Sequence, residues 1–569
     1  MIVLISLATI TDMKEKELFD VGLCSLPGYC FKRSHTILLV LCFLVTITGI
    51  NSVTAQQVNN DVLEVGSQRQ LFVDDFLVDK LLGKAELRLH NPTPQNIVLE
   101  TNEPWEGNGT NYVTVFMDES KYRMYYRACH YSYLGGKDRP NSRDIYCYAE
   151  STDGIHWIKP ELGIISWNGS KKNNIIIDGV GGHAFSPFKD ANPQCKRDAR
   201  YKALGYGRSS KHGLYAFKSA DGIHWQLMDT LPVITKGAFD SQNLAFWDAR
   251  RSQYRGYHRD FRGKDDVDLI NAGADEGRDI RTETSDDFLH WTEPVFLDYS
   301  AIVDPGIKKD IMVTVSNTQV NKVPSERVSE LYTNQIMPYY RAPDLLIGFP
   351  TRYADRGWTE SAKALPRYDY RQVRAKESRR EGTAVTEGMI ISSHDRKHFS
   401  VWPESFLRPG LRNSNTWFYG DMYQNWGLVE TKSMIVDAPP EISLYATERA
   451  LQEKGVILRR YTLRLDGFVS VNAPLAGGEV VTKLIKFTGS KLMLNLSTSA
   501  AGSVRVEIQN ADGQALPGFS LGDCPEIYGD DLERAVVWKG NADLAGISGK
   551  AVRVRFVVSD ADVYSFIFK

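Results

Sequence analysis

Acidic, basic and aromatic residues precede each of five predicted strands, where they could bind and transform a small polar molecule. They are Glu103, Trp105, Glu106 and Asn111 in NEPWEGNGTNY, His183 in GVGGHAF, Asp240, Gln242 and Asn243 in AFDSQN, Tyr340, Arg341 and Asp344 in MPYYRAPDLL, and Trp417, Tyr419 and Asp421 in NTWFYGDMYQNW. A further strand, YRGYHRD, adds His258, Arg259 and Asp260. Carboxyl and imidazole groups can exchange protons, guanidinium groups can hold anions, and aromatic faces can pack against sugar rings.

A sealed β core would carry Val, Ile or Leu at these positions, so we expect a polar site. Asp240 and His258 are its leading candidates, because one repeat delivers both. For Glu103, Asp260 and Asp421, a loop-capping role fits the sequence equally well.

A seven-residue motif that recurs along the chain shows which elements must position these residues. It reads STDGIHW at 151–157, SADGIHW at 219–225 and SDDFLHW at 285–291, and a degenerate copy, SSHDRKHF, begins at Ser392. The Asp side chain can bind the amides of its own turn, and Gly accepts a positive φ. Turn chemistry explains every position, so the motif predicts scaffold rather than catalysis.

Each motif follows three segments with the alternation typical of β-strands, which gives four antiparallel strands per repeat. Such units at roughly 100–160, 180–232, 238–296, 330–405 and 412–465 predict an all-β fold with a five-bladed β-propeller over residues 69–465. The segment RQLFVDDFLV at 69–78 could close the ring. Because the innermost strands of a propeller surround a central channel, the residues that precede them should converge there.

After about residue 470 the chain alternates strictly between apolar and polar residues, with Gly, Asn and Asp between the segments. This pattern predicts a C-terminal, jelly-roll-like β-sandwich over 470–569. We expect it to pack against the propeller. Carbohydrate binding by this domain is less favoured, because no stripe of exposed Trp is visible.

The sequence resembles the five-bladed propeller glycosidase superfamily related to glycoside hydrolase families 32, 43, 62, 68 and 117. The resemblance covers about residues 75–569 and rests on the turn motifs, the five repeats and the order of propeller and sandwich. One uncharacterised branch of this group has segments similar to RQLFVDDFLV, FDSQN, YRGYHRD and LIGFPTRY. The resemblance implies a glycosidase that cleaves oligosaccharides from a polysaccharide with paired carboxylates in the channel. By position, these would be Glu106, Asp240 and one of Asp344, Glu387 and Asp421.

Two alternatives remain open. The predicted rim is richer in His, Arg and Tyr than hydrolysis requires, through His183, His258, Arg259, Arg341, Tyr340 and Tyr419. Arg can neutralise the carboxylate of a uronic acid while His or Tyr moves its C5 proton, which would make the protein a lyase or dehydratase. The other alternative is a glycan-binding protein without catalysis.

The composition narrows the classes of partner. A net charge of −2 over 569 residues argues against a nucleic-acid partner, because binding nucleic acid needs a surplus of Lys and Arg.

The cysteines that follow residue 55 lack the spacing of a metal site; they are Cys129, Cys147, Cys195 and Cys524. Cys129 and Cys147 could form a disulfide or stay separate buried thiols. We expect no cofactor, although Asp-rich loops could hold a structural Ca²⁺, and KESRREG at 376–382 could be a solvated loop or a lid.

Residues 1–55 contain the basic segment KRSH followed by the apolar run TILLVLCFLVTITGI at 36–50. This pattern predicts a secretory signal with an uncertain start, or an uncleaved signal anchor that would be the only contact with a membrane. We therefore expect an exported protein that is periplasmic, on the cell surface or secreted, with an oligosaccharide or polysaccharide as its partner.

Overall fold

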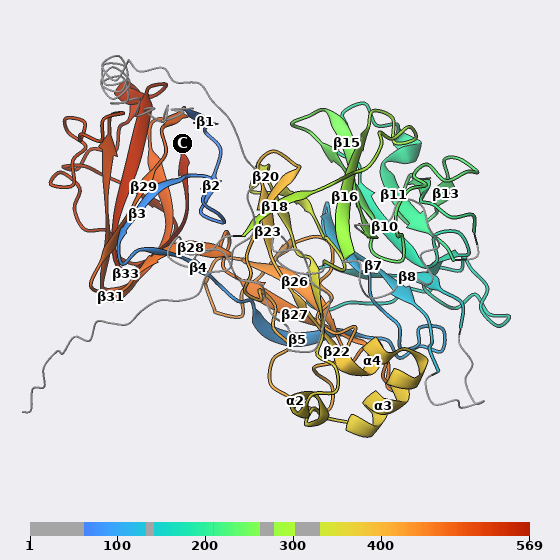
Figure 1. The fold of residues 1–569 in the computed structure, drawn as a ribbon. Coiled ribbons are helices and arrows are strands. Elements are labelled where there is room, and N and C mark those ends of the chain that lie inside the picture. Colours follow the sequence, from blue (N-terminus) through green and yellow to red (C-terminus); the bar gives the residue numbers. More distant parts are fainter. Residues whose placement is uncertain (1–61, 133–141, 209, 262–277, 302–330) are drawn as a thin grey trace, which may run out of the picture. The chain divides into compact units, whose positions relative to one another are not determined.

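The computed structural model describes residues 62–132, 142–208, 210–261, 278–301 and 331–569. The predicted leader lies outside these residues. In the described part no helix is both long and apolar enough to cross a membrane. Nearly all regular structure is β-strand, and five separate sheets follow one another along the chain as the blades of a propeller (Figure 1). The predicted all-β fold and five-bladed propeller are confirmed.

Blades 1 to 3 are four-stranded antiparallel sheets that follow chain order from the inner to the outer strand. Blade 1 contains β6 (Thr114–Asp118), β7 (Lys121–Ala128), β8 (Ile145–Ser151) and β9 (Ile175–Asp178). Blade 2 contains β10 (Ala184–Lys189), β11 (Tyr201–Tyr206), β12 (Tyr215–Ser219) and β13 (Gln226–Leu227), with the 3-10 helix η1 (Arg197–Ala199) before β11. Blade 3 contains β14 (Leu244–Asp248), β15 (Gln253–Phe261), β16 (Arg278–Ser285) and β17 (Val295–Phe296).

Blade 4 departs from this simple order because it carries an insertion. Its strands run in the order β19 (Met337–Tyr339), β20 (Ala342–Gly348), β23 (Ile391–Ser393), β24 (His398–Val401) and β18 (Asp298–Ala301). Between β20 and β23 the chain forms the hairpin β21 (Thr351–Asp355) and β22 (Ala384–Gly388). This hairpin encloses the helices α2 (Glu360–Lys363), α3 (Tyr368–Glu377) and α4 (Arg379–Thr383), which lie together beside β22 in Figure 1.

Blade 5 joins the two ends of the propeller sequence. It contains β25 (Val429–Thr431), β26 (Glu441–Glu448), β27 (Ile457–Leu463) and, as its outer strand, β5 (Thr93–Glu100), which pairs antiparallel with β27. The ring is therefore closed by β5. The segment 69–78 that we expected to close it lies elsewhere: within it, Gln70–Leu71 forms β2 and pairs with a C-terminal strand.

The repeated motif forms the same turn in every copy. In the first, the amides of Ile155 and His156 donate to one carboxylate oxygen of Asp153, and Gly154 adopts a φ of 72°. The fourth copy begins at Ser393 rather than at Ser392, since Asp395 there accepts the equivalent amide bonds.

Tyrosines of neighbouring blades bind these turns. The hydroxyl of Tyr445 in blade 5 donates to Gly154 O at 2.6 Å, and that of Tyr125 in blade 1 donates to Gly222 O at 2.9 Å. Tyr257 of blade 3 does the same with Arg396 O at 2.9 Å. The motif therefore links one blade to the next, which agrees with the scaffold role that the sequence predicts.

The C-terminal β unit draws on both ends of the described chain. Its ten strands are β1 (Leu63–Gly66), β2 (Gln70–Leu71), β3 (Val78–Gly83), β4 (Glu86–Leu89), β28 (Val469–Ala473), β29 (Gly478–Thr482), β30 (Ile485–Phe487), β31 (Leu492–Gln509), β32 (Asp530–Ala535) and β33 (Ala551–Phe568), with the 3-10 helix η2 (Ala545–Ile547). They surround a separate apolar core that includes Phe72, Val506 and Phe556. The strands up to β4 thus belong to this unit, whereas the sequence placed residues from 69 onward in the propeller. A two-layered sandwich stays a prediction.

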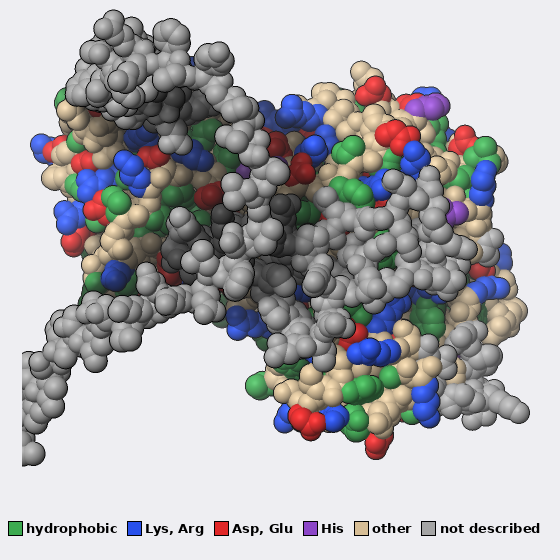
Figure 2. Space-filling model, in the orientation of Figure 1, with side chains coloured by type: hydrophobic (Ala, Val, Ile, Leu, Met, Phe, Trp, Pro, Cys, Tyr) green, Lys and Arg blue, Asp and Glu red, His purple; other side chains and the backbone are tan. Residues whose placement is uncertain are grey.

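The described surface agrees with the near-neutral net charge of the chain. Acidic and basic side chains are interspersed over the face shown in Figure 2, without one large field of either sign. Among the described residues Cys129 and Cys147 are separate buried thiols.

Candidate active site

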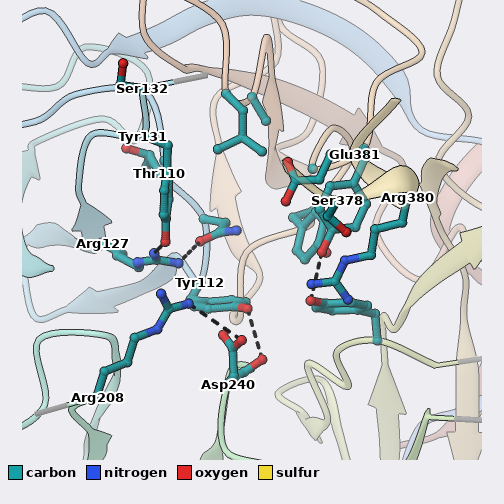
Figure 3. Close-up of a pocket in the computed structure, with 18 residues that line it drawn as sticks. Thr110, Tyr112, Arg127, Tyr131, Ser132, Arg208, Asp240, Ser378, Arg380 and Glu381 are labelled. Carbon is teal, nitrogen blue, oxygen red and sulfur yellow. Dashed lines mark hydrogen bonds and ion pairs between the residues drawn. The ribbon is translucent and has the colours of Figure 1, made fainter. Parts of the chain in front are cut away.

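A cavity of about 280 Å³ lies where the segments that precede several inner strands meet. Eighteen residues line it: Gly109, Thr110, Asn111, Tyr112, Arg127, Tyr131, Ser132, Arg208, Asp240, Tyr332, Ser378, Arg380, Glu381, Tyr419, Gly420, Tyr423, Ala450 and Leu451. The segments before β6, β14, β19 and β25 all contribute. Figure 3 shows Asp240 and Arg208 on one side of the cavity and Arg380 and Glu381 on another. The propeller thus brings together polar groups that are far apart in the sequence.

Asp240 is held in the cavity by a buried histidine. The Nε2 of His183 lies 2.5 Å from Asp240 Oδ1, and its Nδ1 lies 2.7 Å from Asp144 Oδ2. Each ring nitrogen thus faces a carboxylate oxygen, an arrangement that the doubly protonated imidazolium satisfies. The His183 side chain is fully buried, whereas that of Asp240 is 46% exposed.

These neighbours keep Asp240 ionised. Although the Asp240 side chain is partly exposed, the surrounding protein removes water from its carboxyl group and opposes its negative charge. His183, Arg259 and Arg208 outweigh that effect and hold the pKa of Asp240 well below its usual value. The closest contact with Arg208 is 3.6 Å. Asp240 can therefore act as a nucleophile, as a base or as an electrostatic stabiliser, but not as a proton donor near neutral pH.

Arg127 joins the lining to the same network. It forms an ion pair of 2.9 Å with Asp144, donates to Asn111 Oδ1 at 3.1 Å and donates to the Tyr131 hydroxyl. Burial disfavours the charge of Asp144, yet Arg127 and His183 lower its pKa. The side chain of Arg127 is nearly buried and is fixed by these contacts.

Tyr332 differs from the other tyrosines of the cavity. Its hydroxyl accepts a hydrogen bond of 2.9 Å from Tyr419, and the guanidinium groups of Arg259 and Arg278 lie 4.9 Å and 5.0 Å from its ring centre. Burial would raise the pKa of Tyr332, but Arg259 and Arg380 prevail and lower it. Burial raises the pKa values of Tyr112, Tyr419 and Tyr423 instead. Tyr332 is therefore the phenol of this cavity that gives up its proton most readily.

The blade 4 insertion covers one side of the cavity with Ser378, Arg380 and Glu381. These residues lie at the junction of α3 and α4. A carboxylate oxygen of Glu381 is 3.6 Å from Arg374 on α3. Three residues of the run KESRREG thus line the cavity, while its role as a lid stays a prediction.

The structure places five of the predicted site residues at the cavity or directly behind it. Asn111, Asp240 and Tyr419 line it. His183 binds Asp240 from behind, and Arg259 packs against the ring of Tyr332.

Blades 1 and 3 direct other predicted residues away from the cavity. Glu106 is fully buried in blade 1, where it accepts bonds from Tyr126 and Lys159, and Trp105 donates to Asn174. Gln242 binds Val113 O and Gln335, and Asn243 binds carbonyls of its own loop. His258 binds Glu283 and Lys236 O instead of facing the cavity. Successive side chains of a strand point to opposite faces, so His258 and Arg259 on β15 cannot both face it.

In blade 4 the expected inner strand was assigned to the wrong segment. Residues 340 and 341 form the turn between β19 and β20, so they lie at the opposite end of the inner strand from Tyr332. There Tyr340 binds Glu430, Arg341 binds Asp466, and Asp344 pairs with Arg250. Tyr340, Arg341 and Asp344 are therefore not part of the cavity.

In blade 5, Trp417 and Asp421 support the loop that carries Tyr419. Trp417 donates to Gly410 O, and the Asp421 carboxylate accepts the amides of Phe418 and Ala450. Burial raises the pKa of Asp421 to about 7, even though these amide bonds act to lower it. Of the other acids considered, Glu387 pairs with Arg352 and Asp260 with Arg281, both outside the lining.

Sequence reasoning missed most of the charged lining. Arg127 and Arg208 lie on β7 and just after β11, which are second strands rather than leading segments. Tyr332 precedes the true inner strand of blade 4, and Arg380 and Glu381 come from the insertion. Only the charged run at 376–382 signalled part of this set.

No group of three or more His, Cys, Asp or Glu in the described part of the chain is arranged to hold a metal ion. The structural Ca²⁺ that Asp-rich loops suggest stays a prediction.

Comparison with known proteins does not assign the chain to a family. No protein-family model matches it. An uncharacterized protein of Mycobacterium tuberculosis is 25% identical over 175 residues, which are 30% of this chain and 51% of that protein. The chain thus spans about half the length of this relative.

Solved structures with a similar course of the chain include carbohydrate-active enzymes. The N-acetylgalactosamine deacetylase from F. plautii is 12% identical with a TM-score of 0.38, over 66% of this chain and 94% of that chain. The Bombyx mori family 32 β-fructofuranosidase is 9% identical with a TM-score of 0.36, over 85% and 94%. The catalytic domain of the Coprinopsis cinerea family 62 α-L-arabinofuranosidase is 8% identical with a TM-score of 0.36, over 65% and 97%. At these scores the likeness carries no argument about activity, and the propeller assignment rests on the blades described above.

Proposed function

We propose that the protein is a carbohydrate-active enzyme that hydrolyses a glycosidic bond in its propeller cavity, with Asp240 and Glu381 as the two carboxyl groups. The observation that carries this proposal is that both acids line one cavity while coming from different elements. Glycoside hydrolysis needs two carboxyl groups on either side of the scissile bond. A volume of about 280 Å³ is near the lower bound of ligand sites, which span roughly 300–1,000 Å³, and suits one or two sugar units.

The surroundings of the two acids suggest different roles. His183, Arg259 and Arg208 keep Asp240 negative, which suits a nucleophile or the base that activates water. We assign Glu381, the other acid of the lining, the role of proton donor to the leaving oxygen. In this scheme Glu381 gives a proton to the oxygen of the departing sugar, and water supplies the hydroxyl group of the other sugar. The remaining proton of that water molecule passes to a carboxylate, Asp240 if it acts as the base or Glu381 if Asp240 acts as the nucleophile.

The test is activity on oligosaccharide mixtures, read by mass spectrometry. The intact protein should yield fragments whose summed mass exceeds that of the substrate by one water molecule, about 18 mass units. Asp240→Asn and Glu381→Gln should each lower the rate by at least about a hundredfold. The matched control is Asp344→Asn, because Asp344 is an acid at the end of blade 4 that lies away from the cavity. This variant should hydrolyse the substrate at the normal rate. Full activity in Asp240→Asn would exclude this mechanism.

Elimination from a uronic acid is a second candidate, and Tyr332 is the observation that favours it. A tyrosine with a lowered pKa beside several arginines could remove the C5 proton of a uronate whose carboxylate those arginines neutralise. Elimination creates a conjugated double bond that absorbs in the ultraviolet and adds no water, so absorbance together with mass separates it from hydrolysis. Ligand binding without any product would instead indicate a glycan-binding protein.

We also infer that the protein is exported, which the basic and apolar segments before residue 51 support. N-terminal sequencing of the protein from fractionated cells tests this. A start near residue 56 in a fraction outside the cytoplasm is expected, and an intact N-terminus in the cytoplasm would contradict it.

A further inference from the structure

The cavity carries more positive than negative charge. Its lining contains three arginines and two acids, Arg127, Arg208, Arg380, Asp240 and Glu381. Directly behind lie Arg259, close enough to lower the pKa values of Asp240 and Tyr332, and Asp144, which pairs with Arg127. With these two groups included, four arginines face three acids, so one positive charge remains in excess. A neutral sugar gives no reason to gather this surplus around a small cavity, because like charges repel one another there.

Arg380 and Arg259 differ from Arg127 and Arg208 in their hydrogen-bond and ion-pair partners. Arg127 has Asp144 at 2.9 Å, and Arg208 has Asp240 at 3.6 Å. In contrast, Nε of Arg380 and both Nε and Nη1 of Arg259 are buried without a hydrogen-bond partner among the described residues. The Arg259 residue is only 5% exposed. Leaving buried guanidinium N–H groups without acceptors is costly, so an acceptor supplied by the ligand would stabilise the site.

We propose that the sugar bound in this cavity is acidic, and that its anionic group docks on Arg380 within the positive field of Arg259. The group would be the carboxylate of a uronic acid or a sulfate ester. A carboxylate fits best, because its two oxygens match the planar guanidinium fork. This inference rests on the proposed function only in that the cavity holds a sugar, and it applies to hydrolysis and elimination alike.

The position of Arg380 makes it the group most suited to sense such a ligand. It lies on α4 of the insertion, and its guanidinium is 5.5 Å from the ring of Tyr419, whose hydroxyl binds Tyr332. An anion placed here would offset the charge that favours ionisation of Tyr332. Binding of an acidic sugar should therefore raise the pH at which Tyr332 loses its proton, and a neutral sugar should not.

Matched pairs of methyl glycosides test the proposal without any need for turnover. Calorimetry would compare methyl glucuronoside with methyl glucoside, methyl galacturonoside with methyl galactoside, and a 6-sulfated with an unsulfated galactoside, using the full-length protein. At least one acidic member should bind about tenfold or more tightly than its neutral partner, and 0.5 M salt should weaken that preference. The carboxylate and sulfate pairs show which anion the site accepts.

Arg380→Gln should remove most of this preference. The matched control is Arg379→Gln, the exposed neighbour on the same helix outside the lining, which should retain it. Tyrosinate absorbance near 295 nm gives a second readout, because the acidic sugar should shift the earliest tyrosine titration to higher pH in the wild type and less in Arg380→Gln.

The outcomes separate this inference from the proposed function. Equal binding of acidic and neutral partners, or a preference unchanged in Arg380→Gln, would overturn the inference even if neutral glycosides are hydrolysed. Tight binding of an acidic sugar that is never cleaved would support the inference and count against hydrolysis.

Discussion

His183 determines the chemical state of Asp240 although it does not line the cavity. It is buried between two carboxylates and contributes to lowering the pKa of both. We therefore regard it as a positioning residue, which fixes the orientation and the charge of the acid that faces the ligand. The influence of His183 on the two carboxylates depends on contacts of 2.5 Å and 2.7 Å. A small displacement of the ring would break these hydrogen bonds.

At the residue scale, His183→Asn should raise the pKa of Asp240 toward its ordinary value. The acidic limb of kcat/KM against pH should then move to higher pH, and kcat should fall by about tenfold or more. A pH–rate profile for the wild type and the variant measures this. His212→Asn, which loses a bond to Gly237 O, is the control. An unchanged acidic limb in His183→Asn would refute the role of His183.

Among the elements, the blade 4 insertion adds the most to the site. Helix α3 holds the blade 5 loop through two buried arginines. Arg371 donates to Trp417 O at 2.7 Å and stacks on Phe418 with 3.8 Å from its guanidinium carbon to the ring centre, and Arg374 donates to Tyr419 O at 3.1 Å. The helix that precedes Arg380 and Glu381 is thus tied to the loop that carries Tyr419.

At the element scale, Arg371→Met should loosen this connection while keeping most of the apolar contact. We expect kcat/KM to fall by about tenfold, chiefly through a higher KM, with a stability loss of about 1–3 kcal/mol for the broken bonds. Kinetics and limited proteolysis within 356–383 would measure both effects. Lys376→Met, an exposed position on the same helix, should behave like the wild type. Normal kinetics together with unchanged proteolysis in Arg371→Met would contradict the proposed connection.

At the scale of the whole molecule, Asp466 joins segments from both ends and the middle of the described chain. Its buried carboxylate accepts bonds from Tyr339 and Arg341 of blade 4 and from Ser565 of β33, and it lies 3.3 Å from Arg69. Burial opposes its charge, but Arg341 and Arg69 lower its pKa. A carboxyl with a lowered pKa stabilises the fold above its unfolded pKa of about 4 and loses that contribution as the pH falls further.

Asp466→Asn should therefore lower the free energy of unfolding by about 2–4 kcal/mol at pH 7, because it removes the buried carboxylate that Arg69 and Arg341 share and leaves them only their more exposed partners, Glu533 and Glu430. The difference from the wild type should shrink as the pH falls below 4. Urea denaturation at several pH values measures both effects. Asp531→Asn, a more exposed acid of the same β unit, should change little. A loss under 1 kcal/mol at pH 7 would show that Asp466 does not join these segments as described.

The sequence by itself determined the scaffold of this protein, because the scaffold depends on local chemistry. The Ser–x–Asp turns bind their own amides within four residues, so each copy of the motif marks one blade wherever it occurs. In blades 1 to 3 the regular spacing also placed the inner strands correctly, and Asn111, His183 and Asp240 follow from it. In blade 4 the insertions broke the spacing, and Tyr340 and Arg341 were taken for the residues that precede the inner strand in place of Tyr332.

Only the tertiary structure decided which polar groups meet. Asp240 and His183 belong to different blades, Arg127 and Arg208 come from second strands, and Arg380 and Glu381 come from a helical insertion. Their contact depends on the closure of the ring by β5 and on the docking of α3, which are long-range events without a local sequence signal. The same limit applies to the rejected acids: Glu106, Asp344 and Asp421 are suitable in type, but their strands and loops direct them to buried or remote partners.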